Sequence, residues 1–60
     1  MDISSYAGKT VLVVFDDGSS FSRRVGRVTW IDVNFLEIID SGRKHLIPLN
    51  KIIRAEVLSQ

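Results

Sequence analysis

Turn-forming residues divide the chain into short apolar runs, and this pattern constrains the fold more than any other feature. Residues 10–15, TVLVVF, are almost entirely β-branched or apolar, which favours a strand covered on both faces. Asp17 and Gly18 follow, and they predict a hairpin because glycine tolerates positive φ and aspartate bonds back to the backbone. The alternation continues, so further strands are expected at residues 21–32, 34–39, 43–47 and 52–58, with turns at residues 16–20, 32–34, 40–42 and 48–51.

The second run is long for one strand and changes phase midway. Phe21 and Val25 share one side of an extended chain, whereas Val28 and Trp30 share the other. Gly26 stands at the change, which predicts a bulge or sharp bend there and places Trp30 in the core. A bent second strand would let a small sheet curl.

The later runs have simpler patterns. Leu36 and Ile38 are expected to face inward because Glu37, which lies between them, faces water. Pro48 is expected to end the fourth strand, since proline cannot donate to the hydrogen-bond ladder, and residues 49–51 fit one 3₁₀ turn. In the last strand, one face is expected to carry Ile53, Ala55 and Val57.

These elements describe one all-β domain over residues 1–60, with residues 1–8 as a short N-terminal segment. We expect a small five-stranded antiparallel barrel, SH3-like or Sm-like, with a bent second strand and a 3₁₀ turn before the last strand. A domain of 60 residues buries only about 60% of its unfolded surface, so disulfides, metals or a partner chain usually reinforce it. The chain has no cysteine and one histidine, which excludes disulfides and leaves tight closure or a partner; no cofactor is expected.

Charge and missing motifs argue against several classes of function. The net charge of +1 is not the strongly basic balance of a typical nucleic-acid binder. Asp16, Asp17 and Asp32 lack the spacing of a catalytic set and there is no glycine-rich phosphate loop, so we do not expect an enzyme. The chain has no apolar run of about 18 residues and no signal-peptide pattern at its start, so a cytoplasmic location is expected.

Basic residues nevertheless gather locally. Lys44 and His45 could contact phosphate and base, or they could keep an edge strand soluble. Arg27, with the adjacent pair Arg23 and Arg24, could grip phosphates, although a solvated strand face is the simpler interpretation. Because neighbours in a strand point to opposite faces, Arg23 and Arg24 cannot both line one surface unless the bend intervenes.

Two further features predict contacts with other molecules. Phe35 is out of phase with its inward-facing neighbours and is expected to be exposed, where it could stack a base or anchor a protein interface. Asn34 could read a base edge or cap the turn. The last two strands carry more apolar residues than one face can bury, which predicts a homo-oligomer with an interface at Leu46, Ile52, Arg54 and Leu58.

Nearly the whole chain resembles the Sm-like superfamily. Four features match. They are Gly8-Lys9 at the start, Asp17-Gly18 in the first hairpin, Gly26 six residues before Asp32, and the closing segment LIPLNKII at residues 46–53. Lys44-His45 before an apolar pair resembles the bacterial Hfq branch, whose Lys-His pair contacts uridine-rich RNA around a ring pore. That resemblance implies a ring in which the fourth strand pairs with the fifth strand of a neighbour.

Residues 47–58 also resemble the last strands of the C-terminal domain of the ribosome maturation factor RimP, which implies a barrel that binds a ribosomal protein. The leading expectation is an RNA-binding Sm-like ring. The alternatives are a protein-interaction barrel and a purely structural oligomerisation module. The residues expected to bind RNA are Lys44, His45, Asn34, Phe35, Arg43, Arg27 and Arg24.

Overall fold

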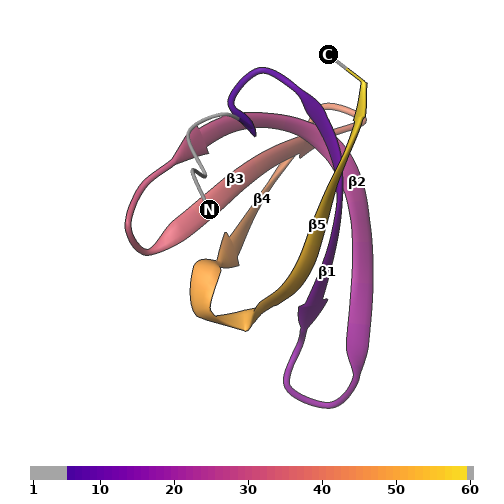
Figure 1. Cartoon of the computed structure of the whole chain (residues 1–60), viewed down its shortest axis with the longest axis vertical. Helices are drawn as coiled ribbons and strands as arrows, with labels where there is room; N and C mark the ends of the chain where they lie inside the picture. Colours follow the sequence, from indigo (N-terminus) through magenta and orange to yellow (C-terminus); the bar gives the residue numbers. More distant parts are fainter. Residues whose placement is uncertain (1–5, 60) are drawn as a thin grey trace.

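The computed structural model describes residues 6–59, and its strands follow the predicted order (Figure 1). Each strand pairs antiparallel with its neighbours, and the order across the sheet is β4-β3-β2-β1-β5. The prediction of an all-β fold with a 3₁₀ turn before the last strand is therefore confirmed. The elements are β1 (Thr10–Asp16), β2 (Phe21–Ile31), β3 (Phe35–Asp40), β4 (Arg43–Pro48), the 3₁₀ turn η2 (Leu49–Lys51) and β5 (Ile52–Ser59).

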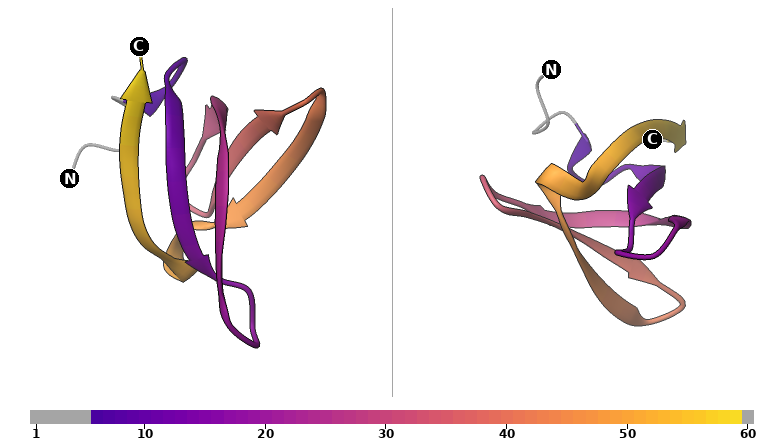
Figure 2. Two further views of the ribbon diagram at one scale, coloured as in Figure 1. Left: turned by 90° about the vertical axis from the view of Figure 1, so that its right-hand side faces the viewer. Right: turned by 90° about the horizontal axis from the view of Figure 1, so that it is seen from below.

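The sheet curls but does not close. Figure 2 shows β5, β1 and the adjoining part of β2 running side by side, while the β3–β4 hairpin stands at an angle to them. Among the described strands β4 pairs only with β3 and β5 pairs only with β1, so each has one free edge. The structure is thus a curled open sheet, and the closed barrel expected from the sequence is not confirmed.

The core lies on the concave side of the curled sheet. Its fully buried side chains come from β1, β2, β3 and β4, and within residues 6–59 none of them is polar. Partly buried residues from the N-terminal turn, from η2 and from β5 pack against this cluster. The buried residues are Val11, Val13, Val28, Leu36, Ile38 and Ile47.

No helix in the described part of the chain has the length and apolar character to cross a membrane.

The expected phase change in β2 lies later than predicted. Gly26 and Val28 are both buried and the residues between Phe21 and Val28 alternate regularly, so no change occurs at Gly26. The pairing with β3 instead shifts between Val28 and Trp30. This bulge turns Trp30 outward, where its side chain is 56% exposed, so the prediction that Trp30 belongs to the core is wrong.

Gly26 has a different and equally specific role. A Cβ atom at this position would lie 2.7 Å from the carbonyl oxygen of Ile39 and would overlap the side chain of Ile38. Neighbouring strands therefore approach here more closely than any other residue allows. The close approach leaves room for the side chain of Ile38 directly beside this glycine.

The last strand also shifts its pairing. A register change between the β1 residues Val14 and Phe15 turns Ile52 toward the core and leaves Ile53 exposed. Ala55 and Val57 lie opposite core residues of β1 and keep the predicted face. The prediction that Ile53 shares that face is therefore wrong, and Ile52 packs against the core of its own chain.

Candidate functional site

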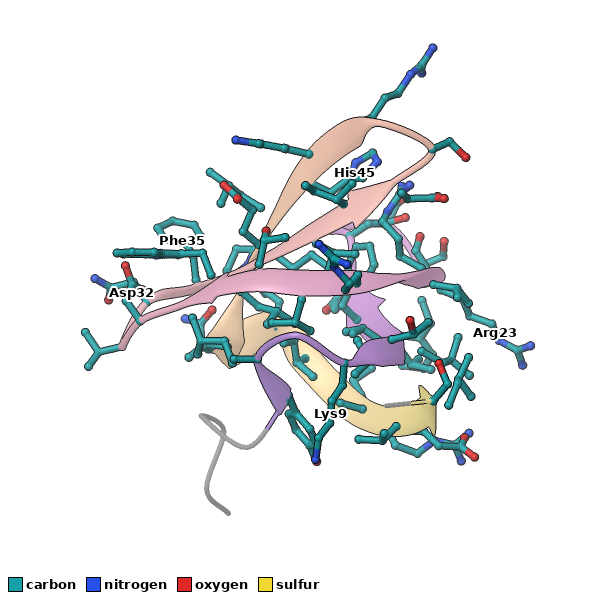
Figure 3. The ribbon with its side chains drawn as sticks, turned by 90° about the horizontal axis from the view of Figure 1, so that it is seen from above. Lys9, Arg23, Asp32, Phe35 and His45 are labelled. Carbon is teal, nitrogen blue, oxygen red and sulfur yellow. The ribbon has the colours of Figure 1, made fainter. Side chains whose placement is uncertain are left out.

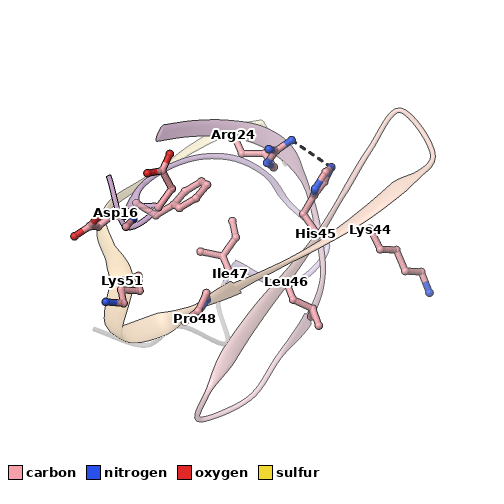
Figure 4. Close-up of a pocket in the computed structure, with 11 residues that line it drawn as sticks. Asp16, Arg24, Lys44, His45, Leu46, Ile47, Pro48 and Lys51 are labelled. Atoms are coloured by element: carbon pink, nitrogen blue, oxygen red, sulfur yellow. Dashed lines mark hydrogen bonds between the residues drawn. The ribbon is translucent and has the colours of Figure 1, made fainter. Parts of the chain in front are cut away.

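Strand β4 divides its basic residues between the two faces of the sheet. His45 lies opposite the buried Ile38, so its side chain faces the concave side. Lys44 lies opposite Ile39 on the outer face and is exposed, and in Figure 4 it extends away from His45. The structure therefore separates two side chains that the sequence analysis treated as one unit.

The inward-facing imidazole meets an arginine from β2. The Nη1 atom of Arg24 lies 3.2 Å from Nε2 of His45 (Figure 4). Because a guanidinium can only donate, Nε2 of His45 is the acceptor of this hydrogen bond. The Nε atom of Arg24 is buried without a hydrogen-bond partner among the described residues, so the guanidinium keeps unused donor capacity.

The pair stands in an open cleft between the end of β1 and β4, which we call the β1–β4 cleft. Its volume is about 530 Å³, and Phe15, Ile47 and Pro48 form an apolar part of its wall. Lys51 was not among the predicted site residues, and η2 brings it to this wall. A basic residue in the turn directly after Pro48 is the signal in the sequence that could have identified it. The charged and titratable residues of the cleft are Asp16, Asp17, Arg24, Lys44, His45 and Lys51.

Asp17, at the end of the cleft, holds the β1–β2 turn together. One carboxylate oxygen accepts hydrogen bonds from the backbone N–H groups of Ser19 and Ser20, each at 3.0 Å, and the other accepts one from the hydroxyl of Ser22. These bonds, with that from Ser22 the strongest, hold the pKa of Asp17 far below its ordinary value. The predicted structural role of Asp17 in a hairpin turn is confirmed.

The other basic candidates lie outside the cleft. Arg23 is opposite Val14 on the outer face, whereas Arg24 is opposite the buried Val13, so the two adjacent arginines do point to opposite faces. Arg27 is exposed on the outer face, and Arg43 is exposed where β4 begins. Of the three arginines in β2, only Arg24 reaches the cleft.

Phe35 and Asn34 lie at a different part of the molecule. Phe35 is 39% exposed, as predicted, and Figure 3 shows it beside Asp32 and away from His45. Asn34 supports the turn through its backbone: its N–H donates to Oδ1 of Asp32 at 2.7 Å, and its carbonyl accepts from the N–H of Leu49 at 2.9 Å. These two residues are therefore not next to the basic residues with which they were grouped.

Phe35 belongs to a second hollow, which we call the aromatic hollow. It is a depression of about 290 Å³ on the outer face of β2, β3 and β4. The β2 bulge contributes Trp30 to it, which the sequence analysis had placed in the core. The residues that line the hollow are Thr29, Trp30, Asp32, Phe35, Glu37 and Leu46.

Three of the four residues expected at an oligomer interface are exposed. Leu46 on β4 is 60% exposed, and Leu58 and Arg54 on β5 also face solvent. Arg54 makes one exposed ion pair, with its Nη2 atom 3.6 Å from Glu56. Ile52 is the exception because it packs against the core of its own chain.

Neither metal-site geometry nor similarity to known proteins adds to this description. Among residues 6–59 no group of three or more histidine, aspartate or glutamate side chains is arranged to hold a metal ion. Comparison with protein-family models, with curated proteins and with solved structures finds no match for this chain.

Proposed function

We propose that this chain is an Sm-like RNA-binding protein without enzymatic activity that acts as a homo-oligomer, and that RNA contacts the β1–β4 cleft. The observation that carries the proposal is the Arg24–His45 pair, 3.2 Å apart, beside the free edge of β4. The guanidinium of Arg24 lines the cleft and offers charged donors to a phosphate or a base edge. The apolar wall at Phe15 and Pro48 offers a surface for a base.

Assembly would make this cleft effective. One copy holds few cations and its cleft also contains Asp16 and Asp17, so a single chain would attract RNA weakly. Repeating the cleft around an axis would concentrate its positive charge. Pairing of β4 with β5 of another copy would satisfy both free edges, and it would help to cover Leu46 and Leu58.

The test combines mass in solution with a matched pair of arginine variants. Light scattering of the intact chain, with and without an oligouridine, measures assembly and RNA uptake at low and moderate salt. Arg24→Ala is expected to weaken RNA binding about tenfold or more, because a hydrogen bond to a charged group is lost. Arg23→Ala, on the outer face of the same strand, is expected to leave the affinity nearly unchanged.

Each outcome has a clear meaning. Equal losses in the two arginine variants would show that RNA responds only to overall charge and that the cleft is not the site. A monomer at micromolar concentration would refute the oligomer. An assembly that takes up no oligouridine at low salt would refute RNA binding.

An apolar outer patch favours a second candidate function, a protein-interaction module. Phe21 is 73% exposed, and with Val14 and Ile53 it lines a depression of about 430 Å³ flanked by Arg23 and Arg54. A large exposed aromatic in an apolar depression is typical of an anchor in a protein interface. Phe21→Ser would abolish binding of a protein partner while leaving RNA binding intact.

A further inference from the structure

The aromatic hollow exposes two aromatic rings that the fold does not need for its core. Trp30 is 56% exposed and Phe35 is 39% exposed, and both line the hollow together with Leu46. The β2 bulge is the reason that Trp30 points outward. Exposed aromatic faces grouped in one depression are costly in water, and they commonly mark a binding surface.

Hydrogen bonds tie the hollow's aromatic and acidic groups together. The indole N–H of Trp30 donates to Oδ2 of Asp32 at 3.3 Å. The other oxygen of Asp32 accepts the backbone N–H groups of Asn34 and Phe35 at 2.7 and 2.8 Å. These bonds, first that from Phe35, lower the pKa of Asp32, so its carboxylate is charged at neutral pH.

A second carboxylate lies across the hollow from this turn. Oε1 of Glu37 accepts a hydrogen bond from the hydroxyl of Thr29 at 2.9 Å. One hydroxyl does not exhaust the acceptor capacity of a carboxylate, which can also bind an arginine side chain. Glu37 lies opposite Leu46 of β4, so its carboxylate stands near the free edge of the sheet.

The hollow therefore combines two aromatic faces with two carboxylates, and no basic residue lines it. Arg27 and Lys44 lie opposite Ile39 in the next row on the same face, and neither of them lines the hollow. Negative charge beside aromatic faces repels phosphate and attracts a cation. We propose that the aromatic hollow binds the positively charged side chain of an arginine or lysine from a partner protein.

This site is independent of the proposed RNA contact. His45 and the aromatic hollow lie on opposite faces of the β3–β4 hairpin, and the ligand chemistry of the two regions is opposite. Occupation of the hollow by a basic residue does not require the cleft to bind RNA. Failure of RNA binding would leave this proposal unaffected, and the converse also holds.

The single tryptophan provides a direct readout. Because Trp30 is the chain's one tryptophan, its fluorescence reports on the hollow alone. The intact chain is titrated with a short glycine-flanked arginine peptide, with the matching lysine peptide, and with a peptide that contains citrulline, the neutral analogue of arginine. We expect a saturable fluorescence change with both charged peptides that weakens as salt is added, and none with citrulline.

Variants test whether the named residues hold the cation. Glu37→Gln keeps an acceptor for Thr29 but removes the charge, and it is expected to weaken binding of the arginine peptide about fivefold. Phe35→Leu is expected to weaken binding about two- to fivefold through loss of one aromatic face. Val25→Thr is the control because it alters an exposed apolar residue of β2 outside the hollow, and it is expected to leave peptide binding unchanged.

Several results would overturn the proposal. Equal binding of the citrulline peptide, unchanged affinity in Glu37→Gln, or no response to either charged peptide would each do so. Quenching of Trp30 by oligouridine that depends on Phe35 would identify the occupant as a nucleic-acid base. Fluorescence that changes on dilution without peptide would identify it as a second copy of the chain.

Discussion

The β1–β4 cleft and the aromatic hollow use neighbouring strands and differ in almost every chemical property. The cleft lies on the concave side and brings together Arg24, His45 and Lys51, whereas the hollow lies on the outer face with Asp32 and Glu37. Each region includes a turn in which an aspartate, Asp17 in the cleft and Asp32 in the hollow, accepts hydrogen bonds from backbone N–H groups. Alternation along a strand is enough to present different groups of side chains on the opposite faces of one thin sheet.

Gly26→Ala would damage both regions together and is expected to have the largest effect. The new methyl group would meet the side chain of Ile38 and the carbonyl oxygen of Ile39, and a backbone atom cannot move aside. We expect a loss of about 3 kcal/mol in the free energy of unfolding, measured by urea denaturation. Val25→Thr at the exposed neighbouring position should cost less than about 1 kcal/mol, and a Gly26→Ala protein of unchanged stability would contradict this account.

Replacing Trp30 and Val28 separately would establish which side of the sheet each occupies. Val28→Ala empties part of the core and is expected to cost about 2 kcal/mol. Trp30→Ala is expected to cost about 1 kcal/mol or less because the ring is largely exposed. A core tryptophan would cost about 3–5 kcal/mol, so a loss of that size would show that Trp30 is buried after all.

Acid should weaken the two aspartate turns unequally. Because folding lowers the pKa of Asp17 and of Asp32, the unfolded chain binds more protons in acid. Their contribution to stability is complete above the unfolded pKa of about 3.9, and it is lost as the pH falls through the lower folded pKa.

Urea midpoints between pH 7 and pH 2 measure this effect. Asp17→Asn is expected to flatten the acid decline more than Asp32→Asn, since Asp17 accepts hydrogen bonds from both hydroxyl and backbone donors. Little change is expected between pH 7 and pH 5. Parallel acid declines in the parent chain and in both variants would contradict the role given to these carboxylates.

The charged residues proposed to bind ligands in the two regions should contribute little to the free energy of unfolding. Lys51→Ala in the cleft and Glu37→Gln in the hollow are each expected to change the free energy of unfolding by less than about 0.5 kcal/mol. The reason is that Lys51 is exposed and that Glu37 makes its hydrogen bond at the surface. Thermal unfolding measures both, and a loss above about 1 kcal/mol would mean that the charge serves the fold.

The strands and turns could be predicted because they depend on neighbours in the sequence. The β-branched runs, the Asp17-Gly18 hairpin and the alternation of Leu36, Glu37 and Ile38 all behave as predicted. The pairing shifts could not be predicted in the same way. They arise where two strands differ in local length or curvature, so the turning of Trp30 outward depends on β3 as well as on β2.

The candidate site shows the same division. The sequence by itself determined that Arg23 and Arg24 face opposite sides and that Phe35 is exposed, because strand geometry alternates from residue to residue. Only the tertiary structure decided which of these faces lies inside. The curled sheet buries its apolar side chains together, and this burial decides which face lies inside. As a result, Arg24 of β2 meets His45 of β4, although the two strands are far apart in the sequence. Lys44, the neighbour of His45 in the chain, points to the outer face.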